Sequence, residues 1–190
     1  MTPVEDTAQK IRSMEIRGAG RIARAGASAM GDFADSYTGA SLEDFVRDLS
    51  EAADVLLASR PTAVSLWNGV HATMRGVDGA SSFEEARALV SGNAKDFCTR
   101  SERAVEEIAR IGARRIQDGD VIMTHCNSSA ALGVIKEAHR QGKDIKVYAT
   151  ESRPWRQGIL TVNDLADAGV DITLIIDSAV RSVMKRTDKV

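Results

Sequence analysis

Aromatic residues are scarce in this sequence, and their scarcity limits how a core can be built. Phe, Trp and Tyr make up 4% of the 190 residues, whereas hydrophobic residues in total make up 43%. A folded core must therefore rest on Ala, Val, Ile and Leu, and the hydrophobic share is too high for a disordered chain. At roughly 100–200 residues per domain, the length corresponds to one large domain or two small ones.

Long apolar runs and an excess of one charge are also missing. No stretch approaches the roughly 18 continuous apolar residues of a membrane span, and the N-terminal MTPVEDTAQK has no apolar signal segment. Lys+Arg and Asp+Glu number 15 and 17 in residues 1–115, and 10 and 10 in residues 116–190. We therefore expect a cytoplasmic protein with neither a membrane nor a nucleic acid as partner.

Cysteine and histidine are too few for a disulfide framework or a structural metal site. The two cysteines, Cys98 and Cys126, form no CxxC pattern, and the three histidines are scattered. The sequence also has no Walker loop and no GxGxxG turn, so we expect neither a metal nor a cofactor. Cys98 falls in a predicted helix and is assigned to packing, the usual role of a lone cysteine.

The hydrophobic pattern divides the chain in two. Apolar residues recur every three or four positions in residues 4–16, 41–59 and 81–116, which predicts helices, the second with Ser41 as its N-cap. From about Asp118, the predicted strands DVIMTH, IKVYATE and DITLIID alternate with the predicted helices SAALGVIKEAHRQGK, TVNDLADAG and SAVRSVMKR. This alternation indicates βαβ units and a parallel sheet.

The predicted fold class is therefore α/β. A helical N-terminal domain, residues 1–116, precedes a partial Rossmann-like parallel α/β domain, residues 117–190. Three strands make a small open sheet, so we expect a further strand to begin at the terminal RTDKV.

The stretch VIMTHCNSSAALGVI places Cys126 where the first predicted strand passes into a helix. Ligands of open α/β sheets bind beyond the carboxyl ends of the strands, and the start of a helix favours an anion and a thiolate. Cys126 is therefore a candidate thiolate beside a bound phosphate. The alternative is a half-buried cysteine next to an ordinary N-cap formed by Ser128 or Ser129, and on spacing alone this alternative is favoured.

Arginines and polar residues near predicted turns are candidates for the same chemistry. Arg17 begins the glycine-rich RGAG turn and Arg60 precedes a proline between two helices, although both also fit plain solvated turns. Arg153 and Gln157 follow the second strand, and Asp177 follows the third, where an N-cap explains it equally well. The set suits a small phosphorylated substrate and proton transfer.

Five motifs in this order resemble archaeal ribose-1,5-bisphosphate isomerases: IRGAGRIARA, RPTAVSL, DGDVIMTHCNSSAAL, GKDIKVYATESRPWRQG and DSAV. That group belongs to the superfamily of the α, β and δ subunits of translation initiation factor 2B and of methylthioribose-1-phosphate isomerase. The resemblance covers residues 11–190. Each motif alone is weak, and their shared order makes the resemblance specific.

The resemblance implies an aldose–ketose isomerase that converts ribose-1,5-bisphosphate to ribulose-1,5-bisphosphate in AMP salvage. It implies a sugar bisphosphate as substrate, a nucleotide activator and a homo-oligomer. By this likeness Cys126 is the catalytic proton acceptor. The substrate-binding residues are Arg17, Gly18, Ala19, Gly20, Arg60, Ser128, Ser129, Ala130 and Gln157, the last by likeness to the methylthioribose branch.

The sequence departs from the family pattern in one respect and leaves two alternatives open. The family's acid, an aspartate in a Gly-Ala-Asp turn, would follow the strand after TDKV, so we expect the 190-residue chain alone to be nearly inactive. Asp177 follows the preceding strand and is not that acid. The alternatives are a non-catalytic subunit like the α subunit of initiation factor 2B, and methylthioribose-1-phosphate isomerase. The cysteine argues against the first, and RGAG in place of the usual RGAP argues against the second.

Overall fold

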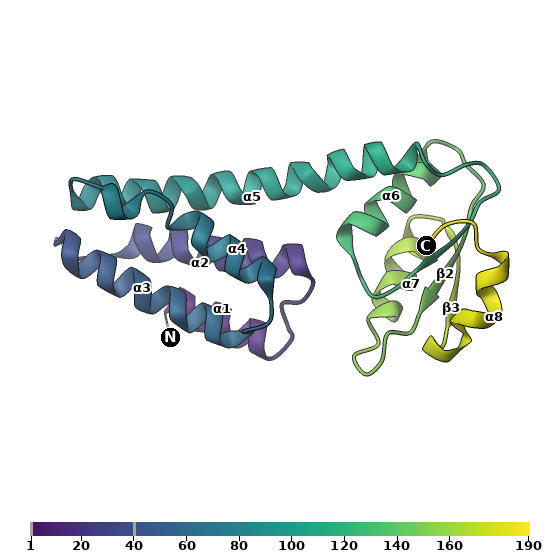
Figure 1. Cartoon of the computed structure of the whole chain (residues 1–190), viewed down its shortest axis with the longest axis horizontal. Coiled ribbons are helices and arrows are strands. Elements are labelled where there is room, and N and C mark those ends of the chain that lie inside the picture. Colours follow the sequence, from purple (N-terminus) through teal and green to yellow (C-terminus); the bar gives the residue numbers. More distant parts are fainter. Residues whose placement is uncertain (1, 40) are drawn as a thin grey trace. The chain divides into compact units, whose positions relative to one another are not determined.

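The computed structural model describes residues 2–39 and 41–190, which form two compact units (Figure 1). The helical unit ends at Glu102 and the α/β unit begins at Arg103. The division falls inside helix α5, Phe83–Ala113, because the last turns of that helix pack on the α/β unit. It therefore lies earlier than the domain boundary that the hydrophobic pattern suggests after residue 116.

The helical unit contains α1 (Pro3–Arg12), α2 (Ala19–Ser36), α3 (Leu42–Ser59), α4 (Val64–Thr73), the short 3-10 turn η1 (Val77–Gly79) and the first part of α5. The predicted N-cap of α3 is confirmed, since the Ser41 hydroxyl accepts the Asp44 N–H. The first predicted helix was too long at its C-terminal end. The chain leaves the helix after Arg12, and Met14 adopts a left-handed conformation with a φ of 63°.

Small residues let the backbones of α2 and α4 come into direct contact. A Cβ on Gly69 would lie 2.5 Å from the carbonyl oxygen of Ala23, and one on Gly26 would lie 2.6 Å from Cδ1 of Leu66. At Gly69 the close atoms belong to the backbone of Ala23, so no larger residue fits at that position without moving a helix. The core around this contact is fully buried and consists mainly of Ile11, Ile22, Met30, Phe45, Leu49, Leu56, Leu66 and Val70.

The α/β unit alternates strands and helices, as predicted. Its elements are β1 (Val121–Thr124), α6 (Ser129–Arg140), β2 (Lys146–Thr150), α7 (Gln157–Asp167), β3 (Asp171–Ile175), η2 (Asp177–Ala179), α8 (Val180–Val183) and η3 (Met184–Arg186). The strands are parallel in the order β1-β2-β3, with Val121 paired to Lys146 and Lys146 to Asp171. The predicted α/β fold class is confirmed. Helix α7 starts four residues before the predicted segment TVNDLADAG.

The terminal residues lie beside β1. Lys189 forms a parallel bridge with Ile122, and its carbonyl accepts the Met123 N–H at 2.9 Å. The expected start of a further strand at RTDKV is thus confirmed, on the edge of β1 that β2 does not occupy. The strand order reverses direction at β1, and such a switch point is where α/β sheets bind ligands.

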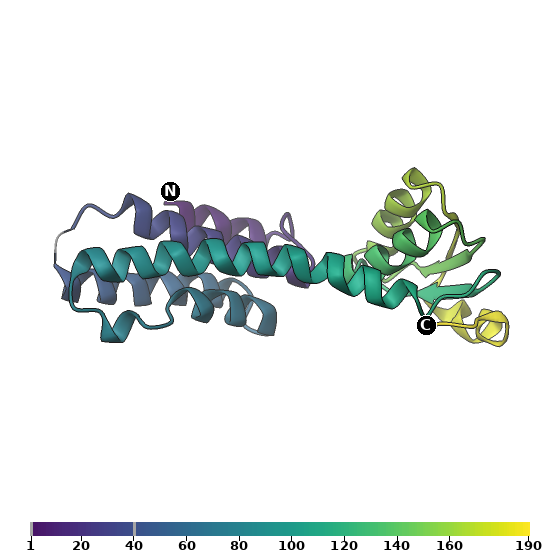
Figure 2. The ribbon, with the colours of Figure 1, turned by 90° about the horizontal axis from the view of Figure 1, so that it is seen from above.

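The helices of the α/β unit cover both faces of its sheet. Helices α6 and α7 lie on one face and the yellow α8 segment on the other (Figure 2). An ion pair between Lys136 and Asp164 joins α6 to α7. Between them and the sheet, Ile122, Ile135, Val147 and Leu165 form the buried core. In the described residues, no helix combines the length and apolar character needed to cross a membrane.

Candidate functional site

Cys126 lies two residues beyond the end of β1 and has an unusual backbone. Its φ is 65°, in the left-handed region that few residues other than glycine adopt. Two hydroxyl groups hold this conformation. The Cys126 N–H donates to Ser152 Oγ at 2.8 Å, and the Cys126 carbonyl accepts from Thr161 Oγ1 at 2.7 Å. Both backbone polar groups of the cysteine are therefore fixed by the segment that follows β2.

Polar side chains form a network around this cysteine. His125 Nδ1 lies 2.5 Å from Thr150 Oγ1 and 3.4 Å from Ser152 Oγ, and the two hydroxyls lie 3.3 Å apart. Asn127 Nδ2 donates to Thr161 Oγ1 at 3.1 Å. Thr150, Ser152 and Thr161 are buried. His125 ends the first predicted strand and Ser152 directly follows the second, which was a signal in the sequence, whereas Thr161 lies within α7 and its pairing with Cys126 and Asn127 had no local signal.

Asp177 joins the end of β3 to this network. Its two oxygens accept the N–H groups of Ser152 and Arg153 at 2.7 and 2.8 Å. These hydrogen bonds, from Arg153 first and then Ser152, lower the pKa of the carboxyl group. The N-cap explanation for Asp177 was wrong, because the residue opens a 3-10 turn and its side chain binds the segment after β2.

The start of α6 provides an anion site next to Cys126. Ser128 is the N-cap, and its hydroxyl accepts the Ala131 N–H at 3.4 Å. The N–H groups of Ser129 and Ala130 belong to the first helical turn and have no partner within the helix. Together with the helix dipole they favour an anion. The structure thus brings four predicted residues, from Cys126 to Ala130, into one short stretch.

Gln157 opens helix α7, which is pressed against the end of β2. A Cβ on the following Gly158 would lie 1.8 Å from the carbonyl oxygen of Thr150, so glycine alone fits there. Beside this contact, the Glu151 carboxylate lies 3.4 Å from Arg153 Nη1 and 3.3 Å from Arg156 Nε. The Arg153 side chain, which the sequence suggested as a ligand-binding group, is 60% exposed and forms an ion pair with this carboxylate.

The remaining predicted residues lie in the helical unit. Gly18, with a φ of 90°, opens α2 without a side-chain cap, so the N–H groups of Ala19 and Gly20 lie in an uncapped first turn. Arg60 ends α3. The α1–α2 and α3–α4 connections, which carry Arg17 and Arg60, lie at the same end of this unit (Figures 1 and 2). Neither guanidinium forms an ion pair within residues 2–39 and 41–190.

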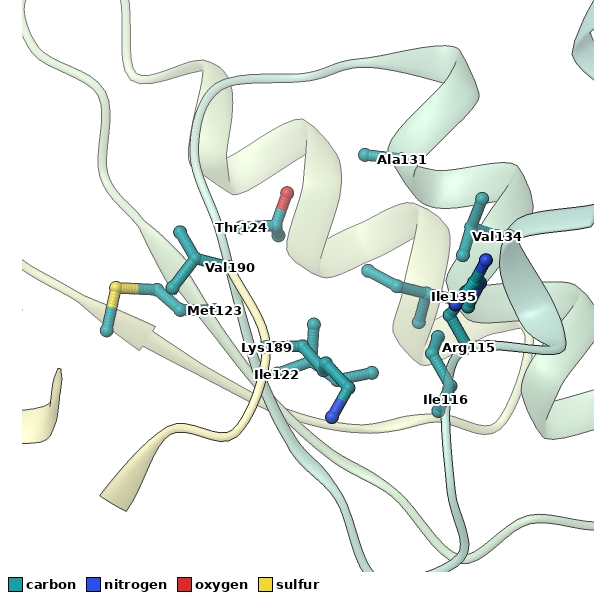
Figure 3. Close-up of a pocket in the computed structure, with 11 residues that line it drawn as sticks. Arg115, Ile116, Ile122, Met123, Thr124, Ala131, Val134, Ile135, Lys189 and Val190 are labelled. Carbon is teal, nitrogen blue, oxygen red and sulfur yellow. The ribbon is translucent and has the colours of Figure 1, made fainter. Parts of the chain in front are cut away.

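A cavity of about 290 Å³ lies on the sheet beside the first turns of α6, where Thr124 and Ala131 are among the residues that line it. Figure 3 shows that Ile122, Val134 and Ile135 surround it, with Arg115 and Lys189 also contributing. Its lining is mainly apolar, and neither Cys126 nor the other predicted site residues of this unit line it. The sequence pattern gave no signal for this cavity.

Two other kinds of reactive group are a possible metal site and the second cysteine, Cys98. Over the part of the chain that the structure describes, no three His, Cys, Asp or Glu side chains gather as a metal site would require. Cys98 lies in α5, as predicted, with its thiol 3.6 Å from the carbonyl oxygen of Arg24. Burial raises the pKa of the Cys98 thiol, which makes it a poor nucleophile at neutral pH.

Comparison with known proteins shows which family the chain resembles. The Initiation factor 2 subunit family matches residues 15–190. Proteins named ribose 1,5-bisphosphate isomerase are 50% identical in Archaeoglobus fulgidus and 47% identical in Methanocaldococcus jannaschii, each over 188 residues. These matches cover 99% of this chain but only 58% and 60% of the relatives, so the chain spans about three-fifths of their length.

A solved structure has the same fold. The crystal structure of the translation initiation factor eIF-2B, subunit delta, from A. fulgidus is 34% identical, with a TM-score of 0.78. The match covers 97% of this chain and 57% of that one. The fold of both units is therefore that of this group of proteins.

Proposed function

Because the chain belongs to the Initiation factor 2 subunit family, we propose that it carries the thiol part of a sugar-phosphate isomerase site for ribose 1,5-bisphosphate. One observation carries the proposal. Cys126 is held in a left-handed conformation at the carboxyl end of β1, immediately before a helix start that can bind phosphate. A packing cysteine needs neither feature.

The reaction requires a base near the first two carbons of the sugar. Protonation of the ring oxygen breaks its bond to C1. C2 then loses a proton and C1 gains one, and the C2 hydroxyl gives up its proton to become the ketone carbonyl, which balances the proton taken up by the ring oxygen. We assign the removal of the C2 proton to the Cys126 thiolate, and the resulting thiol can return a proton to C1. Ser129 and Ala130 would hold a phosphate through their N–H groups, which fixes the sugar beside the sulfur.

The acid that opens the ring must be a group other than Asp177. Both Asp177 oxygens accept backbone N–H groups, and the lowered pKa keeps the carboxylate ionised at neutral pH. An ionised carboxylate has no proton to give. The expectation that Asp177 is not the family acid is supported by this geometry and stays part of the proposal.

The helical unit offers a second set of groups for a bisphosphate. Among the described residues, Arg17 and Arg60 have no ion-pair partner, and Gly18 begins α2 without a side-chain cap. We propose that these residues, with Ala19 and Gly20, bind substrate, as the family resemblance implies. Gln157, at the start of α7, is proposed as a further contact. A homo-oligomer and a nucleotide activator also stay proposals that rest on the resemblance. A cytoplasmic location stays an expectation from the hydrophobic pattern of the sequence.

A non-catalytic subunit is the second candidate, because a relative described as an eIF-2B subunit shares the fold. The two functions differ in whether they require a reactive thiolate at Cys126. A subunit that only senses a sugar phosphate or a nucleotide needs the anion site but no thiolate, whereas the isomerase needs both. Methylthioribose-1-phosphate isomerase ranks below both, and competition between the two sugar phosphates would separate the enzymes.

Phosphorus NMR of ribose 1,5-bisphosphate with this chain tests the proposal. We expect the substrate signals to shift or broaden, with little conversion to ribulose 1,5-bisphosphate by this chain alone. The Cys126→Ser variant should stop conversion, whereas the matched control Cys98→Ser should leave it unchanged. Unaltered turnover in Cys126→Ser would overturn the assignment of the base. Unaltered substrate signals with the wild-type chain would overturn the proposed substrate.

A further inference from the structure

Of the residues other than glycine that adopt left-handed conformations, two are joined by a hydrogen bond. They are Cys126, with a φ of 65°, and Ser152, with a φ of 59°. The Cys126 N–H donates to Ser152 Oγ at 2.8 Å. Such conformations are unfavourable for ordinary side chains and persist only where the surroundings hold them. The conformation of Cys126 therefore depends on whatever holds Ser152.

Asp177 holds Ser152. One carboxylate oxygen accepts the Ser152 N–H at 2.7 Å and the other accepts the Arg153 N–H at 2.8 Å. Bonds to an ionised acceptor are about twice as strong as neutral ones, and two of them fix both position and orientation. None of the hydrogen bonds of Asp177 reaches Cys126 itself. The hydrogen-bonded route from Asp177 to the backbone of the cysteine runs through Ser152, whose hydroxyl accepts the Cys126 N–H.

We infer that Asp177 is a positioning residue for Cys126 and acts through Ser152. The carboxylate fixes the turn after β2, the turn aims the Ser152 hydroxyl, and the hydroxyl fixes the backbone of the cysteine beside the helix start. This inference rests on the proposed role of Cys126 as the base. It gives the carboxylate after β3 a function that involves neither contact with the substrate nor transfer of a proton.

Thr161 provides an internal comparison, because it holds the other side of Cys126 independently. Its hydroxyl donates to the Cys126 carbonyl at 2.7 Å, and it belongs to α7 rather than to the turn that Asp177 binds. Loss of Thr161 and loss of Asp177 should therefore have additive effects. Loss of Ser152 and loss of Asp177 should not, because the two residues act in series.

Amide hydrogen exchange at Cys126 tests this series directly and needs no catalytic activity. We expect Ser152→Ala and Asp177→Ala each to speed exchange of the Cys126 N–H roughly tenfold, the effect of losing one hydrogen bond. The double variant should exchange no faster than Ser152→Ala. Asp171→Ala removes an exposed carboxylate at the start of β3, the strand that precedes Asp177, and should change nothing. Amides within β1 and β2 report whether a variant has loosened the whole sheet.

A second readout asks whether the position of Cys126 matters for its chemistry. We expect the rate of alkylation of Cys126 by iodoacetamide, measured against Cys98 in the same sample, to change severalfold in Ser152→Ala and in Asp177→Ala. Where turnover is measurable, kcat should fall while KM stays within about threefold, since Asp177 does not bind the substrate. The conservative Asp177→Asn keeps one acceptor and should restore part of each effect.

Each outcome decides the inference. Unchanged exchange at Cys126 in Asp177→Ala, or additive effects with Ser152→Ala, would overturn it. If exchange of the Cys126 N–H changes but the alkylation rate and kcat do not, Asp177 has only a structural role, and the inference is overturned as well. If Asp177→Ala does not fold, Asp177→Asn takes its place in the cycle. Failure of the proposed function shows separately, as turnover that survives Cys126→Ser.

Discussion

Replacing Gly158 with alanine tests how tightly the start of α7 packs against the end of β2. The added Cβ would lie 1.8 Å from the carbonyl oxygen of Thr150 and 3.0 Å from Cα of Glu151. All of the close atoms belong to the backbone, so no side chain can rotate away. Ordinary contact begins at 3.4 Å, so the first turn of α7 must move by about 1.6 Å, the difference between the two distances.

The cost can be estimated from the groups that must move. Overpacking against backbone costs about 3 kcal/mol, at the upper end of the usual range. The shift also strains the bond between Thr161 Oγ1 and the Cys126 carbonyl, which contributes about 1 kcal/mol. Alanine returns about 1 kcal/mol through its higher helix propensity. The net loss of about 3 kcal/mol corresponds to a fall in melting temperature of roughly 6–12 °C.

Thermal unfolding followed by circular dichroism measures this loss. Gly92→Ala is the matched control, because Gly92 lies in α5 and a Cβ there would contact nothing within 4 Å. That variant should gain up to about 1 kcal/mol of stability, so the two substitutions should act in opposite directions. A melting temperature of Gly158→Ala within about 2 °C of the wild type would refute the reasoning. It would mean that α7 slides along the sheet at little cost.

Three further predictions follow from other contacts. Gly69→Ala should destabilise the helical unit by about 2–3 kcal/mol in urea unfolding, since its Cβ would lie 2.5 Å from the Ala23 carbonyl oxygen, whereas Gly79→Ala should be neutral. Alkylation of Cys98, followed by mass spectrometry, should still be accelerating above about pH 8.5, because burial raises the pKa of that thiol. Asp177 stabilises the fold above its unfolded pKa and loses this effect as pH falls through its lower folded pKa. The wild type should therefore lose stability below about pH 4, where Asp177 becomes protonated. Asp177→Asn has no carboxylate at this position and should not show that pH-dependent loss.

The sequence predicted the elements better than their ends. A helix buried along one stripe has apolar residues every three or four positions, whereas a strand buried on both faces is a short continuous apolar run. The change from the first pattern to the second predicted where the helices give way to a parallel sheet. Helix ends depend on local bonds that periodicity does not report. Met14 shows this, since its apolar side chain continues the stripe of α1 although its backbone has already left the helix.

The candidate site was predictable as a set of residues but not as a network. Cys126, Ser128 and Gln157 were found because each follows a strand or opens a helix. The bond from Ser152 to Cys126 joins residues 26 positions apart, and the bond from Asp177 to Ser152 spans 25. No local pattern encodes such pairs. The two left-handed conformations were equally hidden, since neither cysteine nor serine usually adopts them.

The parallel register explains why these three residues meet. Thr124, Thr150 and Ile175 end β1, β2 and β3, and Cys126, Ser152 and Asp177 each lie two residues beyond those ends. Thr150 pairs with Ile175, so Ser152 and Asp177 leave the sheet side by side. Thr124 pairs with the residue before Thr150, so Ser152 extends one residue farther than Cys126 and can turn back over it. The left-handed turn at Ser152 makes that return, and the Asp177 carboxylate holds it. A strand order that separated β1 from β2 or β2 from β3 would keep all three residues and lose the chain of bonds.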